Sequence, residues 1–416
     1  MIKKINSKDL KPGMFVHDFN CGWMNHPFIK NSLMIESDEM VGKVMEHGIK
    51  ELYVDTEKSH LKKNVPLNNA QTLEEADREN AKGVKKAIEY DPEVDSLVPM
   101  MEEIDNAVET KTKAKEIVTS VLNDIHSGKD IELDRVDEVV EEMVDSVIRN
   151  KHALTSLGRV KDKDQYTYMH SVNVAILMIS FCRTMKMSRE DLAVFGSGAL
   201  LHDIGKMRVS QELLNKPGKL TELEFDEMKS HVVHSGTILR ETAGVSQKSI
   251  DVASQHHERF DGSGYPHGLK GKEISPGGQM SSIVDVYDAI TSDRCYHKGL
   301  EPMDALKKIF EWSKFHFNPK LVQFYVRSIG VYPVGTLVRL ESDFLGVVVQ
   351  PGETDLTKPL IKVMYDAKSD WIVTPRNLDL SVTPKNGIGC DRIVSTESPI
   401  KWKINPLKYV EYFNNY

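Results

Sequence analysis

The stretch Ala199-Leu200-Leu201-His202-Asp203-Ile204-Gly205-Lys206 places an imidazole and a carboxylate side by side at the end of an apolar helical pattern. Such a pair can serve a cluster of two metal ions, because the carboxylate can bridge both ions while the imidazole binds one of them. Taken alone, a His-Asp dipeptide is more often only the polar end of a helix. Its meaning therefore depends on the other ligand-type residues of the neighbouring helices.

Further histidines lie on the predicted helices around this pair. His170 has apolar residues spaced one turn apart behind it, so its imidazole is expected to face the core. On a later helix, we favour His231 over the nearby His234 as the inward residue. His256 and His257 close the next helix, where adjacent imidazoles can donate two nitrogens to one ion. Each of these histidines, taken alone, is better explained as an ordinary core or surface residue.

An acidic residue among apolar neighbours completes the set. Asp285 lies within an apolar helical pattern, where an unpaired carboxylate would be costly, so it needs a cation. Together the helices offer five imidazoles and two carboxylates: His170, His202, Asp203, His231, His256, His257 and Asp285. Nitrogen and oxygen donors without thiolates suit iron, manganese, nickel or zinc, and their mix does not choose among these metals.

The hydropathy pattern divides the chain into three parts. Residues 1–130 begin with short apolar runs between turn signals, typical of an α+β module, and continue through a polar stretch at 64–95 that indicates a mobile linker or a solvated helix. Residues 131–330 carry helical periodicity, and residues 331–416 are rich in β-type segments. Within the middle part, helices are predicted over 167–186, 189–203, 221–242, 246–258, 276–292 and 302–314. The predicted fold is mainly α, with a small N-terminal α+β domain and a small C-terminal β extension.

Composition excludes several classes of partner. The 416 residues include 54 Lys and Arg against 62 Asp and Glu, a net charge of -8, which argues against nucleic acid polymers or an anionic membrane as the main partner. The longest apolar run, 174–182, is much shorter than the ~20 residues that cross a bilayer, and the polar N-terminus lacks a signal-peptide core. We therefore expect a cytoplasmic protein. The four cysteines form no Cys-x-x-Cys pair, so neither a disulfide framework nor a thiolate zinc site is indicated.

The motifs resemble those of the HD-GYP branch of the HD phosphohydrolase superfamily, the cyclic di-GMP phosphodiesterases of bacterial signalling. The run 202–206 matches its HD signature, and the run from His256 through Asp261-Gly262-Ser263-Gly264-Tyr265-Pro266 matches its GYP signature. The similarity covers about residues 146–330. The part before residue 130 resembles the uncharacterised domain often found ahead of HD-GYP domains. The resemblance implies an HD-type helical bundle that binds divalent metal ions.

The resemblance also implies roles for individual residues. The seven residues of the His and Asp set would ligate metal, with Asp203 as the catalytic bridge and Lys206 near the substrate phosphate. Arg294 matches a family arginine that contacts the ligand, and His297 or Lys298 would reach a phosphate beside it. Members with three metals have Glu one turn before the first histidine, whereas this chain has Tyr166. We therefore expect two divalent ions, with iron or manganese preferred over nickel or zinc.

The implied reaction opens cyclic di-GMP to linear pGpG, with GMP as the product of a second cleavage. Two alternatives stand beside it. The substrate could be another cyclic dinucleotide such as 3′,3′-cyclic GMP-AMP, or the cluster could bind a cyclic dinucleotide without hydrolysis while the Gly264-Tyr265-Pro266 loop docks a diguanylate cyclase. For the N-terminal module we prefer a packing or dimerisation role, which would make the protein a homodimer.

Overall fold

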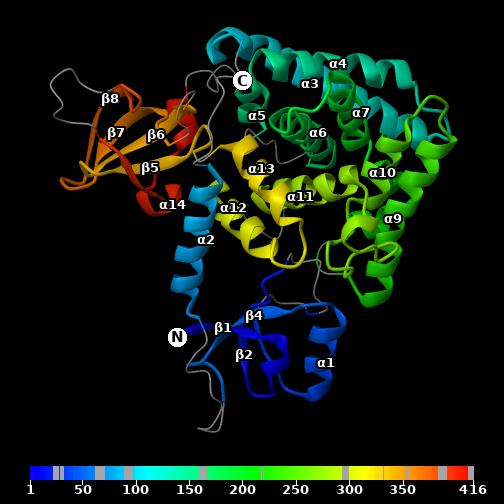
Figure 1. Ribbon diagram of the computed structural model, residues 1–416, viewed down its shortest axis with the longest axis horizontal. Coiled ribbons are helices and arrows are strands. Elements are labelled where there is room, and N and C mark those ends of the chain that lie inside the picture. The colour runs from blue at the N-terminus through cyan, green and yellow to red at the C-terminus, as the bar shows by residue number, and fades with distance from the viewer. Residues whose placement is uncertain are drawn as a thin grey trace.

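The computed structural model is built mainly from helices, with one small sheet near each end of the sequence (Figure 1). The predicted fold class is therefore confirmed. The structure describes residues 1–21, 28, 32–60, 71–88, 97–158, 166–216, 218, 220–292, 299–330, 332–352, 355, 357–382 and 391–410. None of the helices in these ranges combines the length and apolarity needed to cross a lipid bilayer.

The N-terminal part is a four-stranded antiparallel sheet with one helix. Its strands lie in the order β1-β4-β2-β3, so β1 and β4, the first and last strands of this sheet along the chain, pair directly. The elements are β1 (Ile2–Asn6), β2 (Phe15–Asp18), β3 (Leu33–Met34), α1 (Asp38–Glu46) and β4 (Glu51–Asp55). Apolar side chains between Ile5 and Val54 form a core of their own. The polar stretch at 64–95 was predicted to be either a mobile linker or a solvated helix, and part of it forms the helix α2 (Leu73–Ile88).

The helical bundle has α6 (Tyr166–Thr184) at its centre, and the side chains from Val172 to Cys182 are all buried. Apolar residues on all sides of a helix are typical of a core position. The helices around α6 are α3 (Met100–His126), α4 (Leu133–Arg149), α5 (Lys151–Leu157), α7 (Arg189–Leu200), α11 (Pro276–Thr291) and α13 (Pro319–Ile329). The remaining segments are the short helix η4 (Ile204–Arg208), α8 (Gln211–Leu214), α9 (Glu222–Glu241), α10 (Gln247–Gln255) and α12 (Pro302–Trp312).

Local capping explains where the site-bearing helices begin. Thr221 and Glu224 form a capping box at the start of α9, in which each side chain accepts the other residue's backbone N–H. Ser275 caps α11 and Pro276 occupies its first turn, where the missing N–H costs nothing. All six helices predicted between 167 and 314 are present, with their ends shifted by no more than a few residues.

The C-terminal part is a five-stranded antiparallel sheet with the order β8-β7-β6-β5-β9. Its strands are β5 (Leu337–Leu340), β6 (Phe344–Gln350), β7 (Leu360–Asp366), β8 (Trp371–Asp379) and β9 (Ile393–Thr396), followed by α14 (Pro399–Trp402). The apolar side chains of this sheet join the same core as α3 to α13. The domain boundaries near 130 and 330 stay predictions.

Candidate metal centre

Five elements deliver the candidate ligands to one buried place in the bundle. His170 comes from α6, the pair His202 and Asp203 from the turn between α7 and η4, and His231 from α9. His256 and His257 follow α10, and Asp285 comes from α11. The structure thus brings all seven predicted residues together, and three overlapping groups have ligand atoms within 4.8 Å of one another: His231, His256 and His257; His170, His202 and Asp285; His202, Asp203 and His256.

Asp203 lies between two pairs of imidazoles. Its Oδ2 atom is 3.7 Å from His170 Nε2 and 3.3 Å from His202 Nε2. Its Oδ1 atom is 3.4 Å from His231 Nε2 and 3.9 Å from His256 Nε2. Each carboxylate oxygen therefore faces a different pair, which is the arrangement of a bridging ligand.

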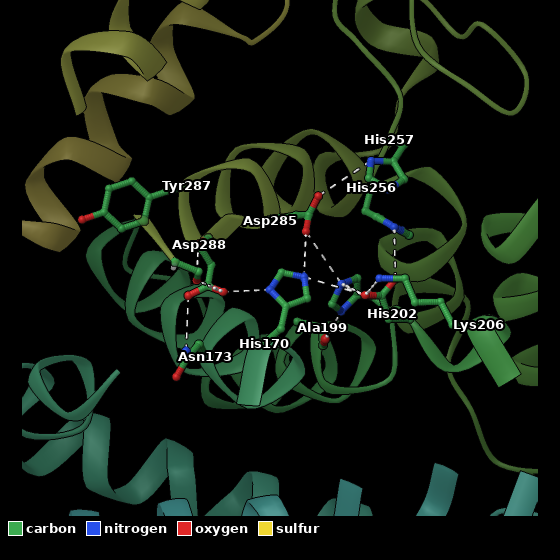
Figure 2. Close-up of polar contacts among 12 residues, drawn as sticks. His170, Asn173, Ala199, His202, Lys206, His256, His257, Asp285, Tyr287 and Asp288 are labelled. Atoms are coloured by element: carbon green, nitrogen blue, oxygen red, sulfur yellow. Dashed lines mark hydrogen bonds and ion pairs between the residues drawn. The ribbon is translucent and has the colours of Figure 1, made fainter. Parts of the chain in front are cut away.

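Asp285 spans the cluster on another side. Its Oδ1 atom lies 3.0 Å from His170 Nε2, and its Oδ2 atom lies 3.7 Å from His257 Nδ1 (Figure 2). Together, the carboxylates of Asp203 and Asp285 lie near nitrogen atoms of all five histidines. Since both are almost completely buried, their negative charge needs compensation within the site.

Hydrogen bonds at the far side of the ring orient three of the imidazoles. The Nδ1 atoms of His202, His231 and His256 lie 2.6 to 2.7 Å from the carbonyl oxygens of the residues three positions earlier. A carbonyl accepts only from a protonated nitrogen, so in each neutral ring Nε2 keeps its lone pair and points into the cluster.

Four buried atoms of the cluster have no hydrogen-bond partner among the described residues: His202 Nε2, His231 Nε2, His256 Nε2 and Asp203 Oδ1. Unsatisfied buried polar atoms are costly and rare, so four of them in one place indicate a missing common partner. A divalent cation fits this donor set, because imidazole nitrogen and carboxylate oxygen are ordinary ligands of such ions.

The electrostatics favour the ligand forms of most of these groups. Burial lowers the pKa of His231 to about 4 and that of His257 to about 3, so both rings are neutral at pH 7. Burial alone would raise the pKa of Asp203, but His202 and Lys206 outweigh it and hold that pKa well below its usual value. His170 differs: burial acts to lower its pKa, but hydrogen bonds with Asp285 and Asp288 raise it to about 9. A cation at Asp285 would compete with that proton.

Asp288 and Asn173 support the site from behind and were not predicted. His170 Nδ1 lies 2.7 Å from Asp288 Oδ2, and Asn173 Nδ2 donates to Asp288 Oδ1 at 3.3 Å. Figure 2 shows His170 between this pair and Asp285. The sequence contains one signal for Asp288: it stands three positions after Asp285, and this spacing places a second acid on the same face of an apolar helix.

Gly205 of the HD signature allows the turn with His202 and Asp203 to pack against α9. A methyl group at Gly205 would lie 2.0 Å from the carbonyl oxygen of His231 and 2.4 Å from the Ser235 nitrogen, so no other residue fits. The Gly205 N–H donates to Ser235 Oγ at 2.9 Å. This close approach fixes Asp203 beside His231.

The predicted substrate contacts are placed only in part. Lys206 lies on η4, is partly exposed, and donates to Asp203 Oδ2, so it adjoins the cluster directly. Arg294, His297 and Lys298 lie in 293–298, outside the described residues. Tyr166 starts α6 one turn before His170, but its side chain also lies outside the described part. Tyr265 of the GYP signature packs its ring 4.7 Å from the His257 ring.

A helical bundle with His-Asp ligands gathered from consecutive helices is the arrangement of the HD-type metal-dependent phosphohydrolases. Comparison with known families agrees: residues 147–321 match the HD domain, and residues 2–136 match a domain of unknown function, DUF3391.

Comparison with named relatives narrows the family to which the chain can be assigned. A Pseudomonas aeruginosa protein, cyclic di-GMP phosphodiesterase PA4108, is 36% identical over 409 residues, covering 98% of this chain and 95% of the relative. A Thermotoga maritima cyclic di-GMP phosphodiesterase is 35% identical over 166 residues, or 40% of this chain and 45% of the relative. A Vibrio cholerae 3′3′-cGAMP-specific phosphodiesterase 3 is 36% identical over 159 residues, or 38% and 34%. The chain belongs to the HD-domain phosphodiesterase family, in the group with an N-terminal DUF3391 domain, as the resemblance predicted.

Proposed function

We propose that this chain is a metal-dependent phosphodiesterase that hydrolyses cyclic di-GMP to linear pGpG, and to GMP by a second cleavage. The observation that carries the proposal is the position of Asp203, whose two oxygens face two different imidazole pairs. The nearly full-length similarity to a cyclic di-GMP phosphodiesterase supports the choice of substrate.

The chain's own residues bind and orient the reacting groups. Asp203 and Asp285 would hold two divalent ions, with the five histidines completing the ligand set. Such ions lower the pKa of a bound water and neutralise phosphate oxygens. Lys206 adds a positive charge beside Asp203, and because the Lys206 side chain is partly exposed, a phosphate oxygen can approach it. In the same proposal Arg294 and His297 or Lys298 contact the second phosphate.

We propose two ions for each chain, with iron or manganese preferred over nickel or zinc, because Tyr166 stands where a third ion would need a carboxylate. Elemental analysis combined with anomalous scattering counts the ions. Three fully occupied positions would contradict the proposed ligand set.

A second candidate substrate is 3′,3′-cyclic GMP-AMP, because a relative that is 36% identical over 159 residues is named as specific for it. The test is turnover of a cyclic dinucleotide panel by protein loaded separately with iron, manganese, nickel and zinc. Cleavage of cyclic di-GMP with the highest kcat/KM supports the proposal. Preference for cyclic GMP-AMP selects the second candidate, and metal binding without turnover selects a binding module.

The proposal also includes a cytoplasmic location, a homodimer and a diguanylate cyclase contact through the Gly264-Tyr265-Pro266 loop. Sedimentation and a pull-down with a purified cyclase test the last two.

A further inference from the structure

The loop that follows the paired histidines is in direct contact with the N-terminal domain. Lys50, just before β4, places its Nζ atom 2.9 Å from Asp261 Oδ2 and 5.3 Å from the centre of the Phe315 ring. Two residues earlier, a methyl group at Gly48 would lie 2.7 Å from Ser263 Cβ. The N-terminal sheet therefore packs closely on the loop of the GYP signature.

Asp261 organises this loop from inside. Its side chain is only 8% exposed, and its Oδ1 atom accepts hydrogen bonds from the Ser263 N–H at 3.0 Å and the Ser263 hydroxyl at 2.6 Å. Its Oδ2 atom faces the Lys50 ammonium group. A carboxylate withdrawn from water needs a countercharge, and here the N-terminal domain supplies one.

The other end of the loop contacts a candidate ligand. The Tyr265 N–H donates to the His257 carbonyl at 3.2 Å, and the Tyr265 ring lies 4.7 Å from the His257 ring at an interplanar angle of 32°. A Cβ at Gly264 would lie 2.4 Å from the Arg259 nitrogen, so the loop folds back tightly on itself before Tyr265.

The orientation of the His257 ring depends on its packing with Tyr265, whereas hydrogen bonds orient the other four histidine rings. The other four histidines have Nδ1 in a hydrogen bond outside the cluster, with Asp288 for His170 and with a carbonyl for the rest. The Nδ1 atom of His257 instead faces Asp285, at 3.7 Å. Within the described residues, Tyr265 is the ring that packs on His257 from outside the cluster.

We propose that Lys50 is a positioning residue for the metal centre: by neutralising Asp261 it fixes the loop that holds Tyr265 against His257, and so strengthens divalent cation binding at the end formed by His231, His256 and His257. The inference rests on the proposed metal-dependent function. It gives the N-terminal domain a defined task, which is to keep this end of the site in its binding geometry.

The test compares five variants of the full chain, four single variants and the Lys50→Met/Asp261→Asn double variant, by titration of metal-free protein with Mn²⁺ against a chelating dye. Lys50→Met removes the charge and keeps the alkyl stem, Lys50→Arg keeps the charge, and Asp261→Asn removes the partner. Lys43→Met is the matched control, because Lys43 also pairs across the same interface, with Glu222 at 3.7 Å, away from the loop. Hydrogen exchange of the amides of 261–265 is measured on the same samples.

We expect Lys50→Met and Asp261→Asn to weaken one of the two Mn²⁺ binding steps by about 10-fold, the size of effect typical for groups that orient metal ligands. The double variant should bind no more weakly than the single ones, loop exchange should accelerate, and Lys50→Arg and Lys43→Met should match the unchanged protein. At limiting Mn²⁺ the Lys50→Met protein should lose activity that saturating Mn²⁺ restores.

Unchanged Mn²⁺ affinity in Lys50→Met would overturn the inference, and so would an equal loss in Lys43→Met, which would point to the interface as a whole. The titration does not require turnover. A chain that hydrolyses no cyclic dinucleotide would therefore refute the proposed function while the titration still decides the role of Lys50.

Discussion

Asp203 is the residue whose replacement should affect the site most, because one carboxylate faces imidazoles on both of its sides. Asp203→Asn keeps the shape but replaces one ligand oxygen and removes the negative charge. We expect loss of bound metal and a fall in kcat of more than ~100-fold, beyond what is usual for residues that only orient ligands. His202→Ala should behave similarly. The measurements are metal content and turnover, with circular dichroism to confirm folding. Near-normal turnover by metal-loaded Asp203→Asn protein would refute the bridging role.

Lys206 tests a contact with substrate rather than with metal. Its ammonium group pairs with Asp203 but is partly exposed, so it can also meet a phosphate oxygen. Lys206→Ala should keep both ions and lower kcat and kcat/KM together by about 100-fold, the loss seen when one charge-stabilising donor is removed. A rise in KM alone would reduce its role to binding, and loss of metal would make it structural. Lys129→Ala, an exposed lysine paired with Asp124 away from the cluster, is the control.

At the scale of single residues, the sequence indicated which side chains gather in the cluster, but it did not indicate which residues position them. The apolar neighbours of His170 and Asp285 indicated that both side chains are buried, but His170 could be predicted as a member of the cluster only when it was considered together with the His202-Asp203 pair and the other histidines. The need for Gly205 could not be predicted, because it follows from a close approach of backbone in α9. Asp288 was missed for a similar reason: its role depends on a partner 118 positions away along the chain.

Among the elements, α12 holds the N-terminal sheet to the bundle through a buried acid. Glu311 accepts hydrogen bonds from the Tyr53 hydroxyl at 2.6 Å and Asn20 Nδ2 at 3.2 Å, and it forms a short ion pair with Lys4. Glu311→Ala would leave the buried Lys4 ammonium with Glu51 alone. We expect a loss of about 3 to 4 kcal/mol in the free energy of unfolding, in the lower part of the range for a broken buried pair.

Chemical denaturation followed by tryptophan fluorescence measures this loss. Lys308→Met is the matched control on the same helix, because its pair with Asp18 is more exposed and should cost no more than about 1 kcal/mol. Equal losses in the two variants would show that burial of Glu311 adds nothing.

Helices whose apolar residues recur with a clear period were predicted well, whereas elements without such a period were not predicted. The helix α4, for example, buries an apolar stripe that recurs at helical spacing from Val136 to Val147, a pattern that indicates a helix directly. The short helix α5 offers less than two turns of pattern, and β8 is an exposed edge strand with Pro375 inside it. An edge strand needs no alternation of apolar residues and tolerates proline, so β8 gave no usable signal.

For the whole molecule, the contact between the N-terminal sheet and the metal-bearing bundle could not be predicted. Lys50 and Asp261 are more than two hundred positions apart, and neither stands in a pattern that specifies the other. The acidic composition indicated that a small anionic ligand would need a local basic or metal site. In the described residues, the fold gathers one buried cluster of His and Asp side chains that could hold such ions.

The pH dependence of metal binding is a property of the complete cluster. At pH 7 His231 and His257 are already neutral, because burial lowers their pKa values to about 4 and 3. His170 is protonated, because Asp285 and Asp288 outweigh burial and raise its pKa to about 9. A cation must therefore displace a proton from His170, and metal affinity should increase as pH rises towards that value.

We expect the dissociation constant for the ion at His170 to fall by about 10-fold per pH unit between pH 7 and 8.5, with about one proton released when this ion binds. Titration calorimetry in buffers of different ionisation enthalpy measures both quantities. Activity at limiting metal should rise over the same range, and excess metal should move this acid limb to lower pH. Asp288→Asn removes one of the two groups that raise the His170 pKa, so its slope should be shallower. A dissociation constant that does not change with pH, or an acid limb that does not move with metal concentration, would show that another ionisation controls the site.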